Sequence, residues 1–369
     1  MRHFSILQSD DPKFGNFCWP SIARLADGRL VTVASGFRMN HVDPFGKVVA
    51  SVSEDDGKTW SEPKVLIDSP LDDRDAGILP YGDGFLLISF TLGREELQFY
   101  FERHEGRPDT EEKCQMYFDA MNRITDEDEA RYLGSTVYYF DADFKEQYHV
   151  KMPITSPHGP TLLRDGRVML VGRTMASEHA TMGDTVKVYF SRDGKNFDTC
   201  VDLDLPKDGM DSRAFYCEPH CLELADGTIL VQYRLQYHRA GEDSKHFTIY
   251  QSVSTDGGKT FSPAAPLNIP EEDLCGSPPH LIQMKDGTVV LTYGYRLEPY
   301  GQRARISRDS GKTWSKEMIL RDDGISWDLG YPATVELKNG NLLSIYYQIP
   351  VGKKNRAILA TEWHPSEFN

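Results

Sequence analysis

Ser53–Trp60 reads SEDDGKTW, and three later stretches repeat its pattern: SRDGKNF (Ser191–Phe197, one residue shorter), STDGGKTF (Ser254–Phe261) and SRDSGKTW (Ser307–Trp314). The shared order is Ser-x-Asp-x-Gly-x-Thr-aromatic. It predicts a tight turn, because an Asp carboxylate accepts backbone N–H groups further along the chain, Gly adopts positive φ, and the aromatic ring packs into a core. Four copies at the same place in a longer repeat predict an array of similar β-sheets.

The longer repeat is a hairpin made of an apolar strand, Asp-Gly or Asn-Gly, and a second apolar strand. These dipeptides between apolar runs favour a two-residue type I′ turn. Six copies occur, with the turn glycines Gly28, Gly84, Gly166, Gly227, Gly287 and Gly340. We therefore predict an all-β fold, a six-bladed β-propeller of four-stranded antiparallel blades, as a single domain over residues 1–369. The stretch His3–Leu7 is predicted to be the outer strand of the last blade, which would close the ring and leave no exposed edge there.

The wide spacing between Gly84 and Gly166 indicates an insertion in blade two, at about residues 95–134. Four apolar residues recur there at helical spacing, Met116, Phe118, Met121 and Ile124, so the insertion is predicted to be partly helical. It joins the second and third strands of its blade, which places it on the rim of the candidate site. A surface helix over a blade edge, a lid, and a subunit contact in a homo-oligomer all remain open.

Composition argues against several classes of function. The net charge of −15 disfavours nucleic acid and anionic membrane surfaces as partners. No stretch approaches the roughly 18 apolar residues of a transmembrane helix, and no secretion signal is visible, so a cytoplasmic location is expected if Met1 is the natural start. The six cysteines show no framework spacing and are expected to be reduced. Cys217 and Cys221 flank His220, but strand alternation makes a chelate there awkward, so neither a metal nor a cofactor is expected.

The strand order of a propeller predicts which residues share one face. First-strand starts, second-strand ends and third-strand starts open on one side, and the turns described above lie on the other. Second strands end at Arg38, Arg94, Arg173, Arg234 and Arg296, with Gln348 in blade six. First strands begin near Trp19, Asp75, His158, Glu218, His220, His280, Asp328 and Tyr331, while Asp43 follows Arg38 and Arg303 opens a third strand. Carboxylates, imidazoles and arginines gathered around one axis are typical of a carbohydrate-binding pocket. The arginines favour a ligand with an anionic group, although some of them should pair with neighbouring carboxylates.

The repeated turn is the Asp-box, and nearly the whole chain resembles the sialidase-like β-propellers. In SGFRMNHVDPFGK, Arg38 and Asp43 match the Arg and Asp that this family carries in the blade-one loop. In CEPHCLELADGTILVQYR, Glu218 and Arg234 match a first-strand Glu and the Arg closing the next strand. A later family Arg is matched by Arg303, with Arg296 as second choice, and the Tyr that starts the last blade is matched by Tyr331.

The resemblance implies a retaining, exo-acting glycoside hydrolase that removes a terminal, anionic sugar. Asp43 would be the general acid/base, Tyr331 the nucleophile and Glu218 the base that activates it, while Arg234 and Arg303 would hold a substrate carboxylate. A phenol with a reference pKa near 10 needs an adjacent base and cationic surroundings to attack at neutral pH. A neutral nucleophile also suits a substrate whose own carboxylate would repel Asp or Glu, and sialidases are the tyrosine exception among glycosidases.

Two positions depart from the family pattern. Sialidases open blade one with Arg-Ile-Pro, where this chain has Cys18-Trp19-Pro20, and Tyr331 is followed by Pro332 instead of the usual Ser. The missing arginine weakens the case for sialic acid, and Trp19 suggests stacking on a sugar face.

Three alternatives therefore stay open. One is a carboxylate-dependent glycosidase in which Asp75, Glu218 or Asp328 share the work, His158 and His280 orient the sugar and Tyr331 only binds. Another is a lyase on uronic-acid glycans that uses Tyr and His as base and acid. The third is a non-catalytic carbohydrate- or protein-binding propeller, since a fold alone does not determine function.

Overall fold

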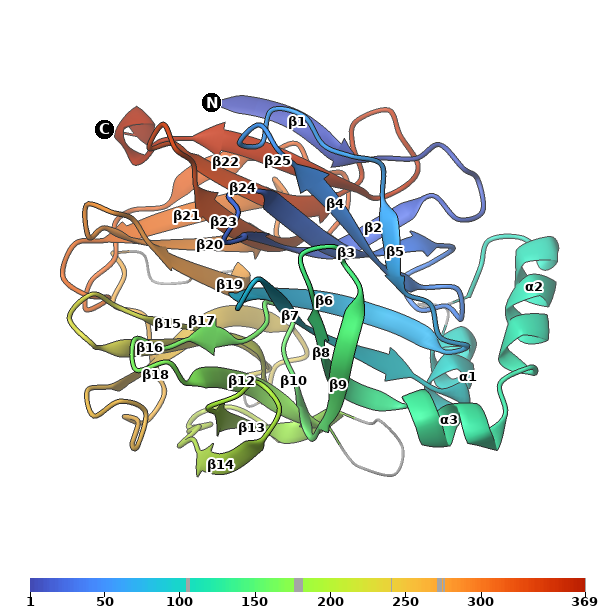
Figure 1. Cartoon of the computed structure of the whole chain (residues 1–369), viewed down its shortest axis with the longest axis horizontal. Coiled ribbons are helices and arrows are strands. Elements are labelled where there is room, and N and C mark those ends of the chain that lie inside the picture. Colours follow the sequence, from blue (N-terminus) through green and yellow to red (C-terminus); the bar gives the residue numbers. More distant parts are fainter. Residues whose placement is uncertain (104–106, 176–181, 240, 271–273, 275, 369) are drawn as a thin grey trace.

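The computed structural model describes residues 1–103, 107–175, 182–239, 241–270, 274 and 276–368. Within these ranges the strands form six antiparallel sheets around a common axis (Figure 1). Hydrogen-bonded neighbours within each sheet are consecutive in sequence, except where the N-terminal strand joins the last sheet and where both parts of a divided first strand pair with the same second strand. The chain therefore builds one blade after another, which confirms the predicted six-bladed propeller.

The blades have the following bounds. Blade one contains β2 (Asn16–Arg24), β3 (Leu30–Arg38), β4 (Lys47–Ser53) and β5 (Lys64–Ile67). Blade two contains β6 (Asp72–Tyr81), β7 (Gly84–Leu92), β8 (Gly134–Phe140) and β9 (Glu146–Met152). Blade three has a divided first strand, β10 (Ile154–Thr155) and β11 (Thr161–Leu162), followed by β12 (Val168–Met175), β13 (Met182–Ser191) and β14 (Phe197–Asp202).

The second half of the ring is built in the same way. Blade four contains β15 (Phe215–Glu223), β16 (Ile229–Tyr237), β17 (His246–Ser254) and β18 (Ala265–Pro266). Blade five contains β19 (Gly276–Gln283), β20 (Val289–Tyr295), β21 (Gly301–Ser307) and β22 (Met318–Arg321). Blade six contains β23 (Gly330–Glu336), β24 (Leu342–Gln348), β25 (Ala357–Trp363) and β1 (Arg2–Leu7), and the short 3₁₀ helix Pro365–Phe368 follows β25.

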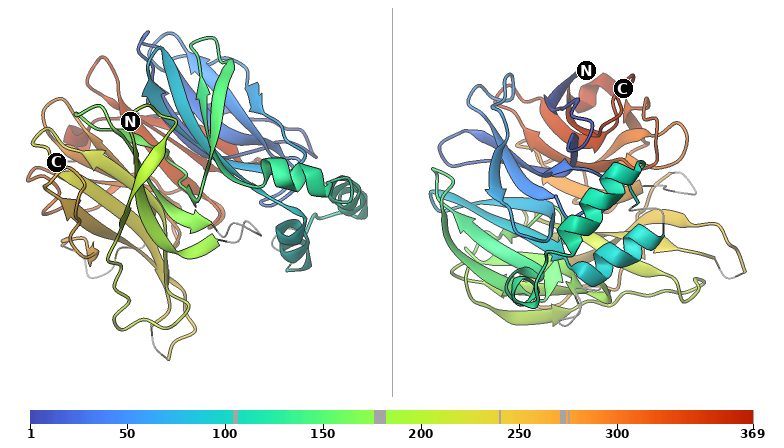
Figure 2. Two further views of the ribbon diagram at one scale, coloured as in Figure 1. Left: turned by 60° about the horizontal axis from the view of Figure 1, so that its bottom comes forward. Right: turned by 90° about the vertical axis from the view of Figure 1, so that its right-hand side faces the viewer.

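The N-terminal strand closes the ring. β1 pairs antiparallel with β25, with Arg2 opposite Glu362 and Leu7 opposite Ile358. Leu7 is buried in a cluster that also contains residues of blades one and six. The two ends of the chain consequently lie side by side (Figures 1 and 2), and the terminal amine is 2.5 Å from Glu367 Oε2. The predicted outer strand at His3–Leu7 is confirmed.

The hairpin turns differ from the predicted type I′ turns. In blade one, the Gly28 N–H donates to the Leu25 carbonyl at 2.9 Å, and Gly28 has a φ of 93°, whereas Asp27 is not left-handed. This is a type I turn followed by a G1 bulge. Blade two has a two-residue turn in which Gly82 (φ 59°) is left-handed, not the predicted Gly84. Gly84 begins β7, where a Cβ would lie 1.9 Å from the Phe140 carbonyl oxygen.

The Asp-box turns are closed by the side-chain bonds that their sequence predicts. Asp55 Oδ1 accepts the Lys58 and Thr59 N–H groups at 3.0 and 2.9 Å, and Asp55 Oδ2 accepts the Thr59 hydroxyl at 2.7 Å. These bonds recur at Asp256 and Asp309, with a variant at Asp193. The turns lie beside the hairpin turns, since Asp56 Oδ2 accepts the Lys338 N–H at 2.8 Å.

Three helices form the predicted insertion between β7 and β8: α1 (Arg94–Glu102), α2 (Glu111–Met121) and α3 (Asp126–Tyr132). The hydroxyls of Thr110 and Thr125 cap α2 and α3. Leu97, Phe101 and Tyr117 pack with Phe90 of β7 and with Val42 of the blade-one loop in one cluster. Figure 2 shows the helices standing to one side of the blades. Among the described residues, no helix is long and apolar enough to cross a membrane.

Candidate active site

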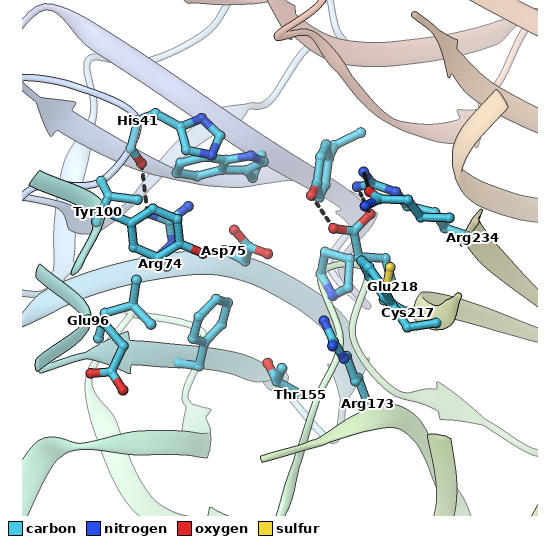
Figure 3. A pocket seen from close by; sticks show the side chains of 18 of the residues that line it. His41, Arg74, Asp75, Glu96, Tyr100, Thr155, Arg173, Cys217, Glu218 and Arg234 are labelled. Carbon is cyan, nitrogen blue, oxygen red and sulfur yellow. Dashed lines mark hydrogen bonds and ion pairs between the residues drawn. The ribbon is translucent and has the colours of Figure 1, made fainter. Parts of the chain in front are cut away.

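A pocket of about 630 Å³ opens at the propeller axis, on the face where the first strands begin (Figure 3). All six blades contribute to its lining, and α1 adds a wall made of Glu95, Glu96, Phe99 and Tyr100. This size lies in the range of small-molecule sites. The predicted site residues that line it are Trp19, Asp75, Glu218, Arg234, Arg296 and Tyr331.

A repeated backbone irregularity brings four of these residues together. Trp19, Asp75, Glu218 and Tyr331 each occupy the same position near the start of a first strand, with φ values of 51°, 39°, 47° and 50°. The pairing register of each strand shifts at that point, and Pro20, Pro219 and Pro332 follow three of them. Non-glycine residues adopt this left-handed conformation at an energetic cost, and such residues cluster at functional sites. The bulge explains why one residue per strand lines the pocket at this position.

Tyr331, Glu218 and Arg234 form a hydrogen-bonded chain at the pocket floor. The Tyr331 hydroxyl donates to Glu218 Oε1 at 2.5 Å, and Arg234 Nη1 donates to Glu218 Oε2 at 2.7 Å (Figure 3). The three residues come from β23, β15 and β16. Glu218 is therefore anchored by a cation on one oxygen and faces the phenol with the other, which is the arrangement needed to receive the phenol proton.

The pKa values of two carboxyl groups of the pocket, Asp75 and Glu218, are shifted in opposite directions. Burial raises the pKa of Asp75 to about 7, and the nearby Glu218 charge adds to this while Arg74 opposes it. Burial would also raise the pKa of Glu218, but Arg234 and Arg296 outweigh burial and hold that pKa below its usual value. Burial, together with Glu218 and Asp75, raises the pKa of Tyr331 well above 10. Near pH 7 the pocket thus holds an ionised Glu218, a neutral phenol and an Asp75 that is about half protonated.

Three of the five predicted second-strand arginines reach the pocket. Arg173, Arg234 and Arg296 belong to the consecutive blades three, four and five, and all three line it. Arg296 donates to the Leu329 carbonyl at 3.1 Å, and its guanidinium carbon lies 5.8 Å from the centre of the Tyr331 ring. Lys245 adds a fourth cation on this side.

The other arginines lie elsewhere. Arg38 is fully buried and binds both carboxylate oxygens of Asp72, at 2.7 and 3.0 Å. Arg94 is the first residue of α1 and pairs with Asp126 and Glu129. Arg303 is 2 % exposed, bonds to Glu317 Oε1 at 3.1 Å and donates to the Arg321 carbonyl. None of the three lines the pocket.

Asp43 also lies outside the lining, in the wall behind the pocket. Its side chain is fully buried and accepts the backbone N–H groups of Asn40 and Phe45, both at 2.9 Å. Arg38 lies 3.6 Å away. Burial raises the pKa of Asp43 to about 6, with Arg38 opposing the shift. In this structure Asp43 shapes the blade-one loop, whereas Asp75 presents its carboxyl group to the pocket.

The predicted histidines form a cluster inside the channel. The rings of His220 and His280 stack at 4.3 Å, and His158 meets them edge-on at 5.5 and 5.1 Å. His220 Nδ1 accepts the Leu281 N–H at 2.9 Å, and His280 Nδ1 accepts the Thr334 N–H at 3.3 Å, so these rings tie one blade to the next. All three lie outside the pocket lining, and burial keeps their pKa values below 6.5. No group of ligating side chains suited to a metal ion occurs in the described ranges.

Trp19 is 1 % exposed, and its ring is occupied by protein groups. The guanidinium carbon of Arg74 lies 4.2 Å from the ring centre, and the rings of His41 and Tyr331 meet it edge-on at 5.1 and 6.4 Å. The most exposed aromatic side chains of the pocket lining are Trp327, which is 52 % exposed, and Phe99, which is 46 % exposed.

The BNR repeat-like domain family matches residues 145–344, more than half of the chain. The chain belongs to the BNR repeat-like family.

Solved structures show which proteins share this BNR repeat fold. A protein of unknown function from Dyadobacter fermentans aligns over 98 % of this chain and 97 % of its own, with 23 % identity and a TM-score of 0.71. An α-L-arabinofuranosidase of Fusarium graminearum, solved with arabinobiose, aligns over 99 % of both chains with 15 % identity and a TM-score of 0.62. The leech intramolecular trans-sialidase aligns over all of this chain and 71 % of its own, with 13 % identity and a TM-score of 0.64. At these identities the likeness concerns the fold. Comparison with curated proteins gives no match.

Several pocket residues of this BNR repeat protein were not predicted from its sequence. His41, Arg74 and Trp327 line the pocket, as do the α1 residues. Arg74 directly precedes Asp75, so its place on a first strand was a usable signal. His41 offered none, because its partner Asp328 is 287 residues away.

Proposed function

We propose that this protein is a retaining glycoside hydrolase that removes a terminal sugar acid, with Tyr331 as nucleophile, Glu218 as its base and Asp75 as general acid/base. The observation that carries the proposal is the 2.5 Å bond from the Tyr331 hydroxyl to Glu218, beside Arg234 and open to the pocket. We assign the role of general acid to Asp75 instead of Asp43, because Asp75 lines the pocket and has a pKa of about 7, so that about half of it is protonated at neutral pH.

The chemistry takes two steps. Tyr331 Oη attacks the anomeric carbon and passes its proton to Glu218, while the Asp75 carboxyl group protonates the departing glycosidic oxygen. Asp75, now a carboxylate, then takes a proton from water, which attacks the anomeric carbon and releases Tyr331. The phenol regains its proton from Glu218. Opposite tuning of two carboxyl groups is the usual mark of such a division of labour.

The cations on blades three to five support an anionic substrate. Arg173, Arg234 and Arg296 converge on one side of the pocket, and guanidinium groups bind carboxylates with two parallel bonds. Arg234 and Arg296 also lower the free energy of the Glu218 carboxylate, so these two serve both binding and chemistry.

A second candidate is a glycosidase that uses Glu218 and Asp75 alone, with Tyr331 as a positioning residue. It is favoured by the raised pKa of Tyr331, which makes the phenol a poor source of phenolate. Among proteins that share the fold, an α-L-arabinofuranosidase of Fusarium graminearum has been solved as a Glu-to-Ala variant in complex with an iminosugar inhibitor.

A panel of 4-nitrophenyl glycosides tests the proposal, with glucuronide, galacturonide, N-acetylneuraminide and α-L-arabinofuranoside as members. We expect release of nitrophenol from an acidic glycoside, and Tyr331→Phe should lower kcat by at least about a thousandfold, because nucleophile loss removes the covalent route. Tyr139→Phe is the matched control, since Tyr139 donates to Asp83 at 2.6 Å on the outside of blade two.

Mass spectrometry of a fluorosugar-trapped enzyme distinguishes the two candidates. Label on Tyr331 supports the tyrosine mechanism, and label on Glu218 supports the carboxylate pair. Full activity in the Tyr331→Phe variant with loss in Glu218→Gln would reject tyrosine as nucleophile. An unsaturated product absorbing in the ultraviolet would identify a lyase instead.

A further inference from the structure

His41 is held in place from several sides although it belongs to a loop. Its backbone carbonyl accepts Arg74 Nη1 at 2.7 Å and Arg38 Nη2 at 3.0 Å. Its Nδ1 lies 3.1 Å from Asp328 Oδ2, and its ring meets Trp19 edge-on at 5.1 Å. The side chain is 31 % exposed and lines the pocket. A partly exposed imidazole with this many restraints is preorganised for a ligand.

The surroundings of Asp328 determine which ring nitrogen carries the proton. Asp328 accepts the Tyr347 hydroxyl at 2.6 Å and lies 2.6 Å from Arg356 Nη2. Burial would raise its pKa, but His41, Arg356 and the Tyr347 bond lower it well below 3.8, so the carboxylate has no proton to give. His41 Nδ1 must then be the donor to Asp328. In a neutral imidazole this leaves Nε2 unprotonated, and an unprotonated nitrogen only accepts hydrogen bonds.

The charges around His41 favour its neutral form. Burial lowers the pKa of His41, Arg74 and Arg356 lower it further, and Asp328 opposes them, with a net shift below 6.5. Nε2 has no hydrogen-bond partner among the residues that the structure describes. At pH 7 and above, the pocket wall of blade one therefore presents an acceptor opposite the cationic wall of blades three to five.

We propose that His41 Nε2 accepts a hydrogen bond from a hydroxyl or amide N–H of the sugar, and that the His41–Asp328 pair thereby determines substrate orientation. The inference deepens the proposed function and rests on it for the identity of the substrate as a sugar acid. The carboxylate of the sugar faces Arg234 and Arg296, and a carbon that bears a hydrogen-bond donor faces His41. The pocket then rejects analogues without that donor, because Nε2 would be desolvated without a partner.

The first test uses the ligand-free protein. Proton–nitrogen correlation spectra of the histidine rings at pH 7.5 should show His41 protonated at Nδ1 and unprotonated at Nε2, with assignment by the His41→Asn variant. Adding glucuronate, galacturonate and N-acetylneuraminate in separate samples should shift the Nε2 signal with at least one of them. A proton on Nε2, or no shift with any sugar acid at saturation, would overturn the inference.

The second test uses two substitutions that separate the two ring nitrogens. His41→Asn keeps an N–H toward Asp328 but removes the acceptor at the Nε2 position, and His41→Gln returns an amide oxygen near that position. Against the accepted 4-nitrophenyl glycoside, we expect His41→Asn to lose about tenfold in kcat/KM, mainly through KM, and His41→Gln to recover part of it. A substrate analogue that lacks the one hydroxyl bound by His41 should show a similar loss of kcat/KM with the unsubstituted protein. With His41→Asn, the same analogue should show no further loss of kcat/KM relative to the full substrate.

His149→Asn is the matched control, because His149 Nδ1 lies 2.6 Å from Glu146 on the exposed outer strand of blade two. Equal kcat/KM for His41→Asn and the unsubstituted protein on every analogue would contradict the inference while leaving the Tyr331 mechanism intact. Failure of the proposed function would look different: Tyr331→Phe and Glu218→Gln would then be without effect on turnover, and the spectra of the free and sugar-bound protein would still decide the role of His41.

Discussion

At the scale of single residues, the pocket works through differences between chemically similar groups. Asp75 and Glu218 lie in the same pocket, but Asp75 is next to Arg74, which is already paired with Asp72 at 3.1 Å. Glu218 receives Arg234 directly and has Arg296 close by. Near pH 7 Asp75 is about half protonated, whereas Glu218 is ionised. A protonated and an ionised carboxyl group can therefore coexist in this pocket near neutral pH, which is what the proposed acid and base require.

The activity should fall as the pH rises through about 7, because the acid form of Asp75 is lost there. A pH profile of kcat/KM on the accepted aryl glycoside measures this alkaline limb. In Asp75→Asn the limb should disappear, and kcat should drop by roughly a hundredfold or more for poor leaving groups. A fluorinated phenol as leaving group should restore much of that loss, and an unchanged alkaline limb in the variant would exclude Asp75 as the acid.

The stability of the protein should also depend on pH through the protonation of Asp75. The folded pKa of Asp75 lies above its ordinary value of 3.8, so the folded state binds the proton more tightly, and the contribution of Asp75 to stability is lost as the pH rises from about 4 to about 7. Asp75→Asn should accordingly unfold at a higher temperature than the parent at pH 8. The gain is on the order of 4 kcal/mol, from a shift of about three pKa units at about 1.4 kcal/mol per unit. At pH 4 the two proteins should be nearly equal, which serves as the control.

At the scale of elements, two features shape the site: the bulged first strands and the helical insertion. The bulges place Trp19, Asp75, Glu218 and Tyr331 at equivalent positions of their strands. For this reason, listing the residues near the starts of the first strands was enough to predict all four from the sequence. Second-strand ends were less informative. Arg38, at the end of a second strand, binds Asp72 of the next blade instead of reaching the pocket. Arg303, at the start of a third strand, is held in the same way by Glu317 of a later turn. Such competition depends on three-dimensional neighbours, so no pattern along the chain reveals it.

Replacing residues 94–133 with a short Gly-Ser linker tests the role of the insertion. The propeller should still fold, because Thr91 and Gly134 already face each other across β7 and β8. The pocket would lose the wall that carries Glu96, Phe99 and Tyr100, so KM for a small aryl glycoside should rise by about tenfold or more while kcat changes less. Circular dichroism and steady-state kinetics measure the two effects.

A point variant separates this role from the packing of the insertion on the blades. Phe99→Ala removes an exposed pocket ring and should raise KM without lowering the melting temperature. Tyr117→Phe removes only a buried hydroxyl that bonds to the Leu97 carbonyl at 2.8 Å, and it should lower stability without changing KM. Unchanged KM in both the deletion and Phe99→Ala would assign the helices to a role away from the substrate.

At the scale of the whole molecule, the closed ring of six blades depends on the pairing of the N-terminal strand β1 with the last strand β25. The hairpin repeat was enough to predict six blades because each copy carries its own turn chemistry, and it identified β1 as the missing strand because blade six had no other candidate. The residues that line the pocket were harder to predict than the number of blades. His41 and Asp328 meet only because the ring closes, which brings blade one against blade six.

Deletion of residues 1–8 should destabilise every blade together. It removes the six-residue strand β1 from its pairing with β25 and uncovers the cluster in which Leu7, Phe4 and Ile6 pack. The expected loss is on the order of 4 kcal/mol from the apolar area exposed, with lower unfolding temperature and reduced solubility from the free edge. Calorimetry measures the loss. Arg2→Ala, which removes an exposed pair with Glu362 at 2.9 Å, should stay within about 0.5 kcal/mol of the parent.

The meeting of the chain ends in blade six also determines which way the protein faces when it is tethered. β1 begins and β25 ends on the side of the Asp-box turns, away from the pocket. A tag or fusion partner at either end would therefore lie on the turn side of the propeller (Figure 1). Immobilised on a bead or sensor surface by such a tag, the protein would point its pocket outward, toward glycans too large to diffuse beneath it.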